Sequence, residues 1–371
     1  MASSLLLFGI GVPQWDSVIP LDEAKEEAMN TVSRIGLDTA KNVFQVHALD
    51  ADGRTVTTRR LRRAQVLDWF ARLDRASDCL VGIEATGGSH YWGRQLQRLG
   101  YRVRLLNPKA VKPYRHGQKN DARDAAAIAE AVAREVISEA PIKSEEQQAL
   151  LARQSYRRRL VERRTALGNQ LRGLLAEFGI VTPQGWKKLK ERLAEAAEDA
   201  DNGLPADLRV VLNDGADELR DLERRIAAQD RELARQAHAD ERSRRLMELD
   251  GVGPLTALRL VAICGDGRAW RNGRGFAVSL GVTPRQHSSG DHQRLGAITG
   301  HGDTELRTLL VHGARSTLHR AAQGAALDGW TERLRRRRPH NVAAVALAHK
   351  RARIAWAMLA HGTPYQPAMT A

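Results

Sequence analysis

The sequence pattern changes near residue 145, and this change constrains the fold more than any other feature. Upstream of it, short apolar runs that fit buried strands alternate with helical segments. From 145 to about 247 the pattern is helical throughout, with heavy use of Arg, Glu, Leu and Ala. The first pattern predicts an α/β domain with a mixed sheet, and the second predicts long helices that form a coiled-coil arm.

Within the α/β part, turn residues and alternating polarity place the elements along the chain. The predicted strands lie within 34–49, 55–60, 79–84 and 101–106, and the predicted helices at about 64–75, 89–99 and 121–136. Breaks are expected in the helical part at 180–185 and 201–205. The region 249–361 is mostly helical, with an insertion rich in Gly, Pro and Ser at 281–302.

These patterns divide the chain into segments. We expect a disordered extension at 1–29, an α/β domain at 30–143 and a helical arm at 144–247. A mostly α C-terminal domain at 248–362 and a tail at 363–371 follow. The extension carries no chemistry that the residues reveal. Translation could start at Met1 or at Met29, which lies just ahead of the first strand.

Charge and composition restrict the partners. The chain has 58 Lys and Arg against 44 Asp and Glu, a net charge of +14, and a pI near 10.3. This excess predicts an anionic partner, with nucleic acid favoured over an acidic membrane surface. No apolar run reaches the roughly 18 residues of a membrane span. The two cysteines, Cys79 and Cys264, exclude a disulfide framework and a four-thiolate zinc site, so a reducing, cytoplasmic location is expected.

Carboxylates follow two strands and open a helix. Asp38 and Glu84 close predicted strands, and Asp121 and Asp124 lie three residues apart at a helix start. Carboxylates that converge on one site repel one another unless they share a cation, and oxygen ligands favour Mg²⁺ or Mn²⁺. Taken singly, Asp121 could instead be an N-cap and Asp38 a turn residue.

Several basic and glycine positions are candidates for nucleic-acid contacts. Residues 151–180 carry a basic helical face, which could also be a solvated surface. A glycine turn between two helices, at 251–253, could present backbone N–H groups to a phosphate in helix-hairpin-helix fashion, or could be an ordinary tight turn. The nucleic-acid candidates are Lys119, Arg123, Arg157, Arg158, Gly251, Gly253 and Arg285.

Several motifs occur in the order of a known family. They are Ile35-Gly-Leu-Asp38-Thr-Ala-Lys41, Gly82-Ile-Glu84-Ala-Thr-Gly-Gly88, Leu105-Leu-Asn-Pro108-Lys-Ala-Val111, Lys119-Asn-Asp121-Ala-Arg-Asp124, Leu249-Asp-Gly251-Val-Gly253-Pro, Gly281-Val-Thr-Pro284 with Ser288-Ser289-Gly290, and Leu306-Arg-Thr-Leu-Leu-Val-His312. Over about residues 30–360 the chain resembles the DEDD insertion-sequence transposases of the one-ten/eleven-eleven type. These are bridge-RNA-guided serine recombinases related to pilin-gene invertases.

The resemblance implies a ribonuclease-H-like (RuvC-like) N-terminal domain that binds Mg²⁺, or Mn²⁺, through Asp38, Glu84, Asp121 and Asp124. It implies a serine nucleophile in the C-terminal domain, DNA as donor and target, and a noncoding bridge RNA. The family's spacing from Pro284 points to Ser289, with Ser288 as the alternative. We expect a nucleoid-associated dimer or tetramer, because strand exchange joins four DNA ends.

One departure and three alternatives qualify this prediction. Family members tend to carry basic residues where this chain has Gly300-His301. By the residues alone, a Ser-Ser-Gly sequence is typical of a polar turn. The alternatives are a DNA invertase with the same chemistry, a structure-selective metal nuclease without a covalent intermediate, and a nucleic-acid-binding protein without catalysis.

Overall fold

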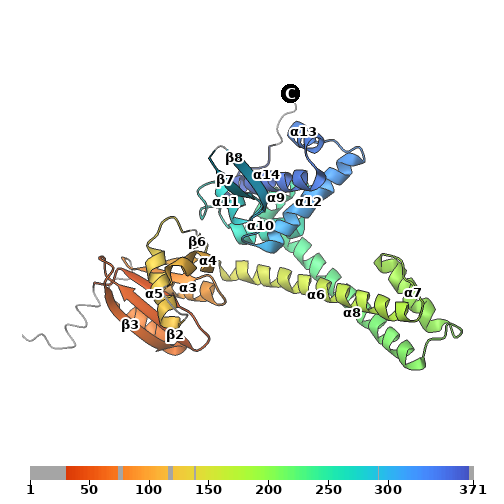
Figure 1. Cartoon of the computed structure of the whole chain (residues 1–371), viewed down its shortest axis with the longest axis horizontal. Coiled ribbons are helices and arrows are strands. Elements are labelled where there is room, and N and C mark those ends of the chain that lie inside the picture. The colour runs from red at the N-terminus through yellow and green to blue at the C-terminus, as the bar shows by residue number, and fades with distance from the viewer. Residues whose placement is uncertain (1–30, 74–77, 116–119, 138, 291, 367–371) are drawn as a thin grey trace, which may run out of the picture. The chain divides into compact units, whose positions relative to one another are not determined.

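The computed structural model describes residues 31–366 except 74–77, 116–119, 138 and 291 (Figure 1). It comprises two compact units, one up to Ser144 and one from Glu145 onward. This division lies next to the expected end of the α/β domain at residue 143. The expected extension 1–29 and residues 367–371 of the tail lie outside the described residues.

The first unit is built on a mixed sheet, as the sequence predicts. Its strands are β1 Arg34–Asp38, β2 Val43–Leu49, β3 Thr55–Arg62, β4 Leu80–Glu84, β5 Arg102–Leu106 and β6 Glu139–Ala140. They are ordered β3-β2-β1-β4-β5-β6. The pairs β1–β4 and β4–β5 are parallel and the remaining pairs antiparallel. A mixed α/β N-terminal domain is therefore confirmed.

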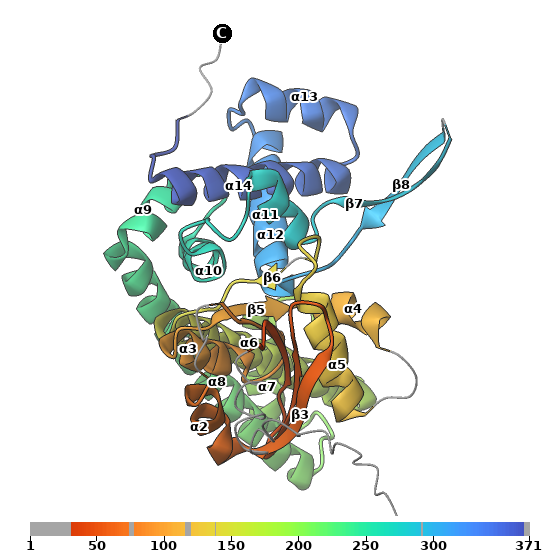
Figure 2. The same cartoon turned by 90° about the vertical axis from the view of Figure 1, so that its left-hand side faces the viewer.

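Helices cover both faces of this sheet. They are η1 Arg63–Gln65, α2 Val66–Ala71, α3 Ser89–Arg98, α4 Pro108–Val111, η2 Lys112–Tyr114 and α5 Asp121–Val132. Figure 2 shows α5 on one side of the sheet and α2 and α3 on the other. On the α2–α3 side, Phe70, Trp92 and Leu96 pack in the core with buried strand residues such as Ile35 and Ile83.

Helix α5 lies unusually close to the central strands because glycines face it. A Cβ on Gly36 would lie 2.0 Å from the carbonyl oxygen of Ala125, and one on Gly82 would lie 2.8 Å from Cβ of Val132. No side chain larger than hydrogen fits at such distances. These two strand glycines therefore set the depth at which α5 packs on β1 and β4.

The second unit is helical, apart from one pair of strands. Its helices are α6 Glu145–Glu177, α7 Trp186–Glu198, α8 Ala206–Ala239, α9 Glu241–Met247, α10 Pro254–Cys264, α11 Gly273–Ser279, α12 Thr304–Ala322, α13 Gly329–Arg337 and α14 His340–His361. The predicted breaks at 180–185 and 201–205 are confirmed. No helix of the described residues is long and apolar enough to span a membrane.

The long helices α6 and α8 pack along each other and also on α10. Leu171, Leu189 and Leu219 form part of a core shared by α6, α7 and α8. A larger core, with Leu260, Leu310 and Leu347 from α10, α12 and α14, lies in the C-terminal part. A coiled-coil arm over 144–247 that is separate from a domain over 248–362 stays a prediction.

The insertion at 281–302 contains strands where the sequence indicated only a polar turn. Strands β7 Pro284–Ser289 and β8 His292–Ile298 pair in antiparallel register around Gly290. All of their described residues are exposed except Ile298, which is half-buried. We call these two strands the ribbon. Polar residues on both faces concealed the alternation of burial by which a strand is normally predicted.

Candidate functional site

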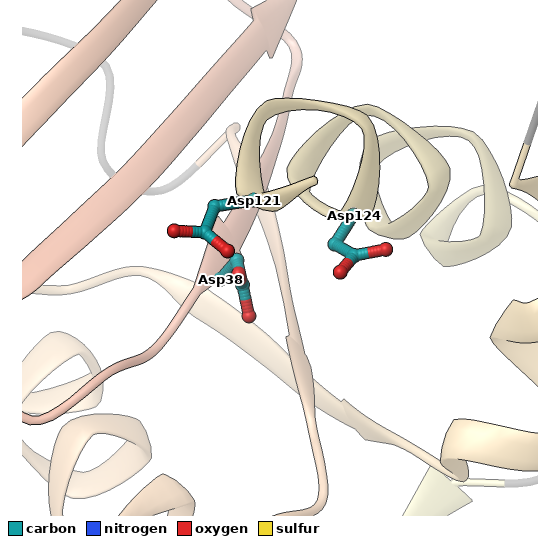
Figure 3. Close-up of side chains that lie close together, drawn as sticks. All are labelled: Asp38, Asp121 and Asp124. Atoms are coloured by element: carbon teal, nitrogen blue, oxygen red, sulfur yellow. The ribbon is translucent and has the colours of Figure 1, made fainter. Parts of the chain in front are cut away.

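Three of the predicted carboxylates meet at the start of α5. Oxygen atoms of Asp38, Asp121 and Asp124 all lie within 4.8 Å of one another. In Figure 3, Asp38 comes from the end of β1, and the carboxylates of Asp121 and Asp124 project from the first turn of α5. We call these three side chains the acidic cluster. The predicted convergence is therefore confirmed for three of four residues.

The first turn of α5 is capped by a different residue from the one that the sequence suggested. Asn120 is the N-cap, and its side-chain oxygen accepts a hydrogen bond of 2.8 Å from the backbone N–H of Arg123. The alternative that Asp121 is the N-cap is therefore wrong. Because Asn120 satisfies the helix terminus, the Asp121 carboxylate remains exposed within the acidic cluster.

Asp124 is the buried member of the cluster, with only 7% of its surface exposed. Its Oδ1 accepts no hydrogen bond, and the guanidinium of Arg115 makes an ion pair with it. A buried carboxylate beside two others is costly unless a cation compensates for it. The donor set, all oxygen, and the burial of Asp124 fit a hard divalent ion. No sequence pattern singled out Arg115.

Glu84 reaches the same edge of the sheet by strand register. β1 and β4 are parallel and pair Leu37 with Ile83, so Asp38 and Glu84 end neighbouring strands. Carboxyl ends of parallel strands meet at one edge of a sheet, so the two residues lie at the same edge. Glu84 does not belong to the acidic cluster as the described residues define it. It is the remaining carboxylate at that edge.

The ribbon places the two candidate nucleophiles on opposite faces. Register pairs Ser289 with His292, Ser288 with Gln293, and His287 with Arg294. Because strand side chains alternate, Ser289 shares a face with His287, His292 and Arg294. The Ser288 hydroxyl lies on the other face and accepts a hydrogen bond of 3.0 Å from Nε2 of Gln286.

Some arginines of the predicted basic helical face pair with carboxylates of their own unit. Arg157 of α6 makes an ion pair with Asp230 of α8. Arg158 lies 3.7 Å from Glu162 and 3.8 Å from Glu305. The contacts with Asp230 and Glu305 join α6 to α8 and α12, whereas the contact with Glu162 lies within α6. Whether either arginine also contacts nucleic acid stays a prediction.

The two glycines of the predicted hairpin turn differ in their surroundings. Gly251 has φ +78°, and a Cβ there would lie 2.6 Å from the carbonyl oxygen of Gly313 and 2.4 Å from Nη1 of Arg351. Gly251 therefore allows a close approach of the turn to α12. Gly253 is exposed, and a Cβ there would meet nothing within 4 Å. The helix-hairpin-helix interpretation stays a prediction.

The remaining nucleic-acid candidates are dispersed. Arg123 is exposed on α5. Arg285 is exposed on β7, and its Nη2 lies 3.5 Å from the carbonyl oxygen of Thr299. Lys119 lies outside the described residues.

Sequence reasoning missed a groove in the second unit. It encloses about 1180 Å³ between the base of the ribbon, α11, α13 and α14. None of the described residues that line it is Asp or Glu, whereas Arg274, Lys350 and Arg353 are among them. Burial, followed by the charges of Arg353 and Arg274, lowers the pKa of His349 there. The run of basic residues on α14 was the sequence signal, but only packing shows that they share one cavity.

Comparison with known proteins identifies the family of this chain. A DEDD-type IS110 transposase family model matches residues 35–180, and the model of the transposase IS116/IS110/IS902 family matches residues 243–328. A "probable family 20 transposase" of Pseudomonas aeruginosa is 48% identical over 91% of this chain and 99% of its own length. The "transposase for insertion sequence element IS1111A" of Coxiella burnetii is 38% identical over 94% of this chain and 95% of its own length. The "transposase for insertion sequence element IS1328" of Yersinia enterocolitica is 36% identical over 91% of this chain and 99% of its own length.

Proposed function

Because the chain belongs to the IS110/IS116 family of insertion-sequence transposases, we propose that it cuts and rejoins DNA through a phosphoserine link at Ser289, with divalent metal at the acidic cluster. DNA is the partner of a transposase. The observation that carries the proposal is the convergence of Asp38, Asp121 and Asp124 within 4.8 Å.

The three carboxylates of the acidic cluster would hold the metal, with Glu84 available at the same edge. A divalent ion bound there would orient a DNA phosphate and stabilise the charge that develops in phosphoryl transfer. Asp121 is exposed and Asp38 half-buried, and Asp124 anchors the set from its buried position. Arg115 must give up its ion pair with Asp124 if that carboxylate is to bind metal fully.

Ser289 supports the proposed chemistry better than Ser288 does. Its hydroxyl makes no hydrogen bond within the described part of the chain, and it shares a ribbon face with the cationic Arg294. An arginine is suited to holding a phosphate beside a nucleophile. In the proposed step the Ser289 Oγ–P bond forms as the hydroxyl proton passes to a base, one P–O bond of the DNA strand breaks, and the leaving oxygen takes a proton from water.

A noncoding bridge RNA that pairs with donor and target DNA is part of the proposal, as is assembly of two or four copies. The net charge of +14 supports a large polyanionic partner. An invertase would use the same chemistry. The structure-selective nuclease would use only the acidic cluster and water.

The test is a denaturing gel of the full chain with the end DNA of its own element, the RNA from that element and Mg²⁺. We expect a covalent protein–DNA adduct. It should be lost in Ser289→Ala and kept in Ser288→Ala, which is the matched control one residue away on the opposite face. Asp121→Asn should reduce the adduct by a factor of about 100 or more, because metal binding fails.

Each other outcome favours a different alternative. Cut DNA without an adduct, unchanged in Ser289→Ala, would support the metal nuclease and reject the serine mechanism. DNA binding without any cutting, unaffected by Mg²⁺ or by Asp121→Asn, would support a binding protein without catalysis.

A further inference from the structure

We propose that the imidazole of His292 accepts the proton of the Ser289 hydroxyl when that hydroxyl attacks DNA. This inference rests on the proposed function, because it assigns the group that activates the proposed nucleophile. The sequence alone showed no His-Asp pair spaced to form a catalytic triad with this serine. The ribbon supplies a histidine through the pairing of its two strands.

The ribbon's register brings the two side chains together. Ser289 closes β7, His292 opens β8, and the two residues are direct cross-strand partners. Side chains in such a pair lie on the same face, with Cβ atoms about 4.5–5.5 Å apart. A hydroxyl and an imidazole at this spacing need only rotamer changes to form a hydrogen bond.

The neighbours of Ser289 narrow the choice of proton acceptor. Among the described residues on its face of the ribbon, the titratable and charged groups are His287, His292, Arg294 and, towards the base, Arg285. Arginine stays protonated and cannot accept. His287 lies two residues earlier on the same strand, about 6.6–6.8 Å along it, whereas His292 is directly opposite.

The chemistry requires such an acceptor. A serine hydroxyl is a weak nucleophile until a base removes its proton, and imidazole is the most common base in this role. In the step proposed, Oγ of Ser289 bonds to phosphorus as its proton passes to a ring nitrogen of His292. The P–O bond to the departing strand breaks, its oxygen takes a proton from water, and the imidazolium returns its proton to solvent. Arg294 on the same face would hold the phosphate.

The experiment measures the single-turnover rate of adduct formation by the full chain, with element-end DNA, element RNA and Mg²⁺, from pH 5.5 to 8.5. We expect His292→Ala to slow adduct formation about 100-fold or more at pH 7.5, within the range of general-base catalysis. The wild-type rate should rise with pH, because the base must be unprotonated to accept a proton, and this rise should be absent in His292→Ala. Added free imidazole should restore part of the rate, because the site is exposed.

Controls separate this role from a structural one. Gln293→Ala, next in sequence and on the opposite face, should react at the wild-type rate. A 100-fold loss in His292→Ala with an unchanged pH profile and no rescue by imidazole would overturn the proposal in favour of a structural role. Loss of the pH limb in His287→Ala and not in His292→Ala would overturn it in favour of His287.

Failure of the inference and failure of the proposed function are distinguishable. If Ser289→Ala abolishes the adduct while His292→Ala reacts at the wild-type rate, only the inference about His292 is wrong. If Ser289→Ala still cuts DNA, the proposed serine mechanism itself is wrong.

Discussion

Asp121 and Asp124 show how neighbouring residues of one type acquire different roles. They lie one helical turn apart, yet Asp121 is exposed and Asp124 is 7% exposed with an arginine beside it. Asn120 accounts for part of this difference, because it takes the capping role that Asp121 would otherwise fill. The sequence predicted both carboxylates as ligands and did not predict how their surroundings differ.

His90 gives a residue-scale prediction for stability against pH. Burial, with the nearby charges of Lys143 and Arg94, lowers the pKa of His90 to about 4. Its Nδ1 accepts a hydrogen bond of 3.3 Å from the backbone N–H of Lys143. Protonation would destroy this acceptor. A free imidazole titrates near pH 6.5, so between about 6.5 and 4 the unfolded chain binds more protons than the folded chain.

The free energy of unfolding therefore depends little on His90 above about pH 6.5, and it falls as the pH drops from there towards 4. Because the side chain is only partly buried, we expect about 1–2 kcal/mol rather than the full shift. Urea unfolding of the wild type and of His90→Gln at pH 7 and 4.5 checks this. A decline in the wild type no larger than in His90→Gln would contradict it.

At the scale of elements, helix α5 links the sheet to the acidic cluster. It carries Asp121 and Asp124, and its distance from β1 is set by Gly36. The same three-residue stretch of β1, from Gly36 to Asp38, thus fixes the helix position and ends on a carboxylate. A shift of α5 would move two carboxylates relative to the third.

Gly36→Ala tests this linkage. The added Cβ would lie 2.0 Å from backbone of α5, so we expect unfolding to become easier by about 3 kcal/mol and Mn²⁺ binding to weaken. Gly87→Ala is the control, because a Cβ there meets nothing within 4 Å. Urea titration and calorimetric Mn²⁺ titration measure the two effects. Equal stability of the two variants would refute the packing argument.

Several arginines of the predicted basic face on α6 contact neighbouring helices. Arg164 and Arg172 of α6 lie over the ring of Trp186, at 4.5 and 5.5 Å from its centre. With Arg157 paired to Asp230, much of the predicted basic face stabilises α6 against α7 and α8. Sequence counts of charge cannot separate residues that face a neighbouring helix from residues that face solvent.

For the whole molecule, the net charge of +14 predicts strongly salt-dependent DNA binding. If the protein neutralises about six phosphates, its affinity should fall about a thousandfold between 50 and 200 mM salt. Fluorescence anisotropy with labelled element-end DNA would measure the slope. We predict that Arg353, which lines the groove with Arg274 and Lys350, contacts one DNA phosphate, so Arg353→Ala should make the slope shallower by about one contact. Arg157 makes an ion pair with Asp230, so Arg157→Ala should change the slope less. Equal slopes for all three proteins would contradict this assignment.

Much of the fold and of the site was predictable because it depends on neighbours in sequence. Apolar runs bounded by turn residues located β1, β2, β4 and β5, and the breaks between α6, α7 and α8. Three of the four predicted carboxylates converge because α5 begins next to the end of β1, and the parallel pairing of β1 with β4 brings Glu84 to the same edge. Family motifs added Ser289, whose role no local pattern indicates.

The remaining features depend on contacts between residues far apart in the chain. The pairing of Arg157 with Asp230, the contact of Gly251 with Gly313 and the lining of the groove arise from helix packing. The ribbon face that joins Ser289 to His292 follows from strand register, and a slip of one residue would put Ser288 there instead. Local pattern encodes the elements and their periodicity, but register and packing depth are set by the free energy of the assembled core.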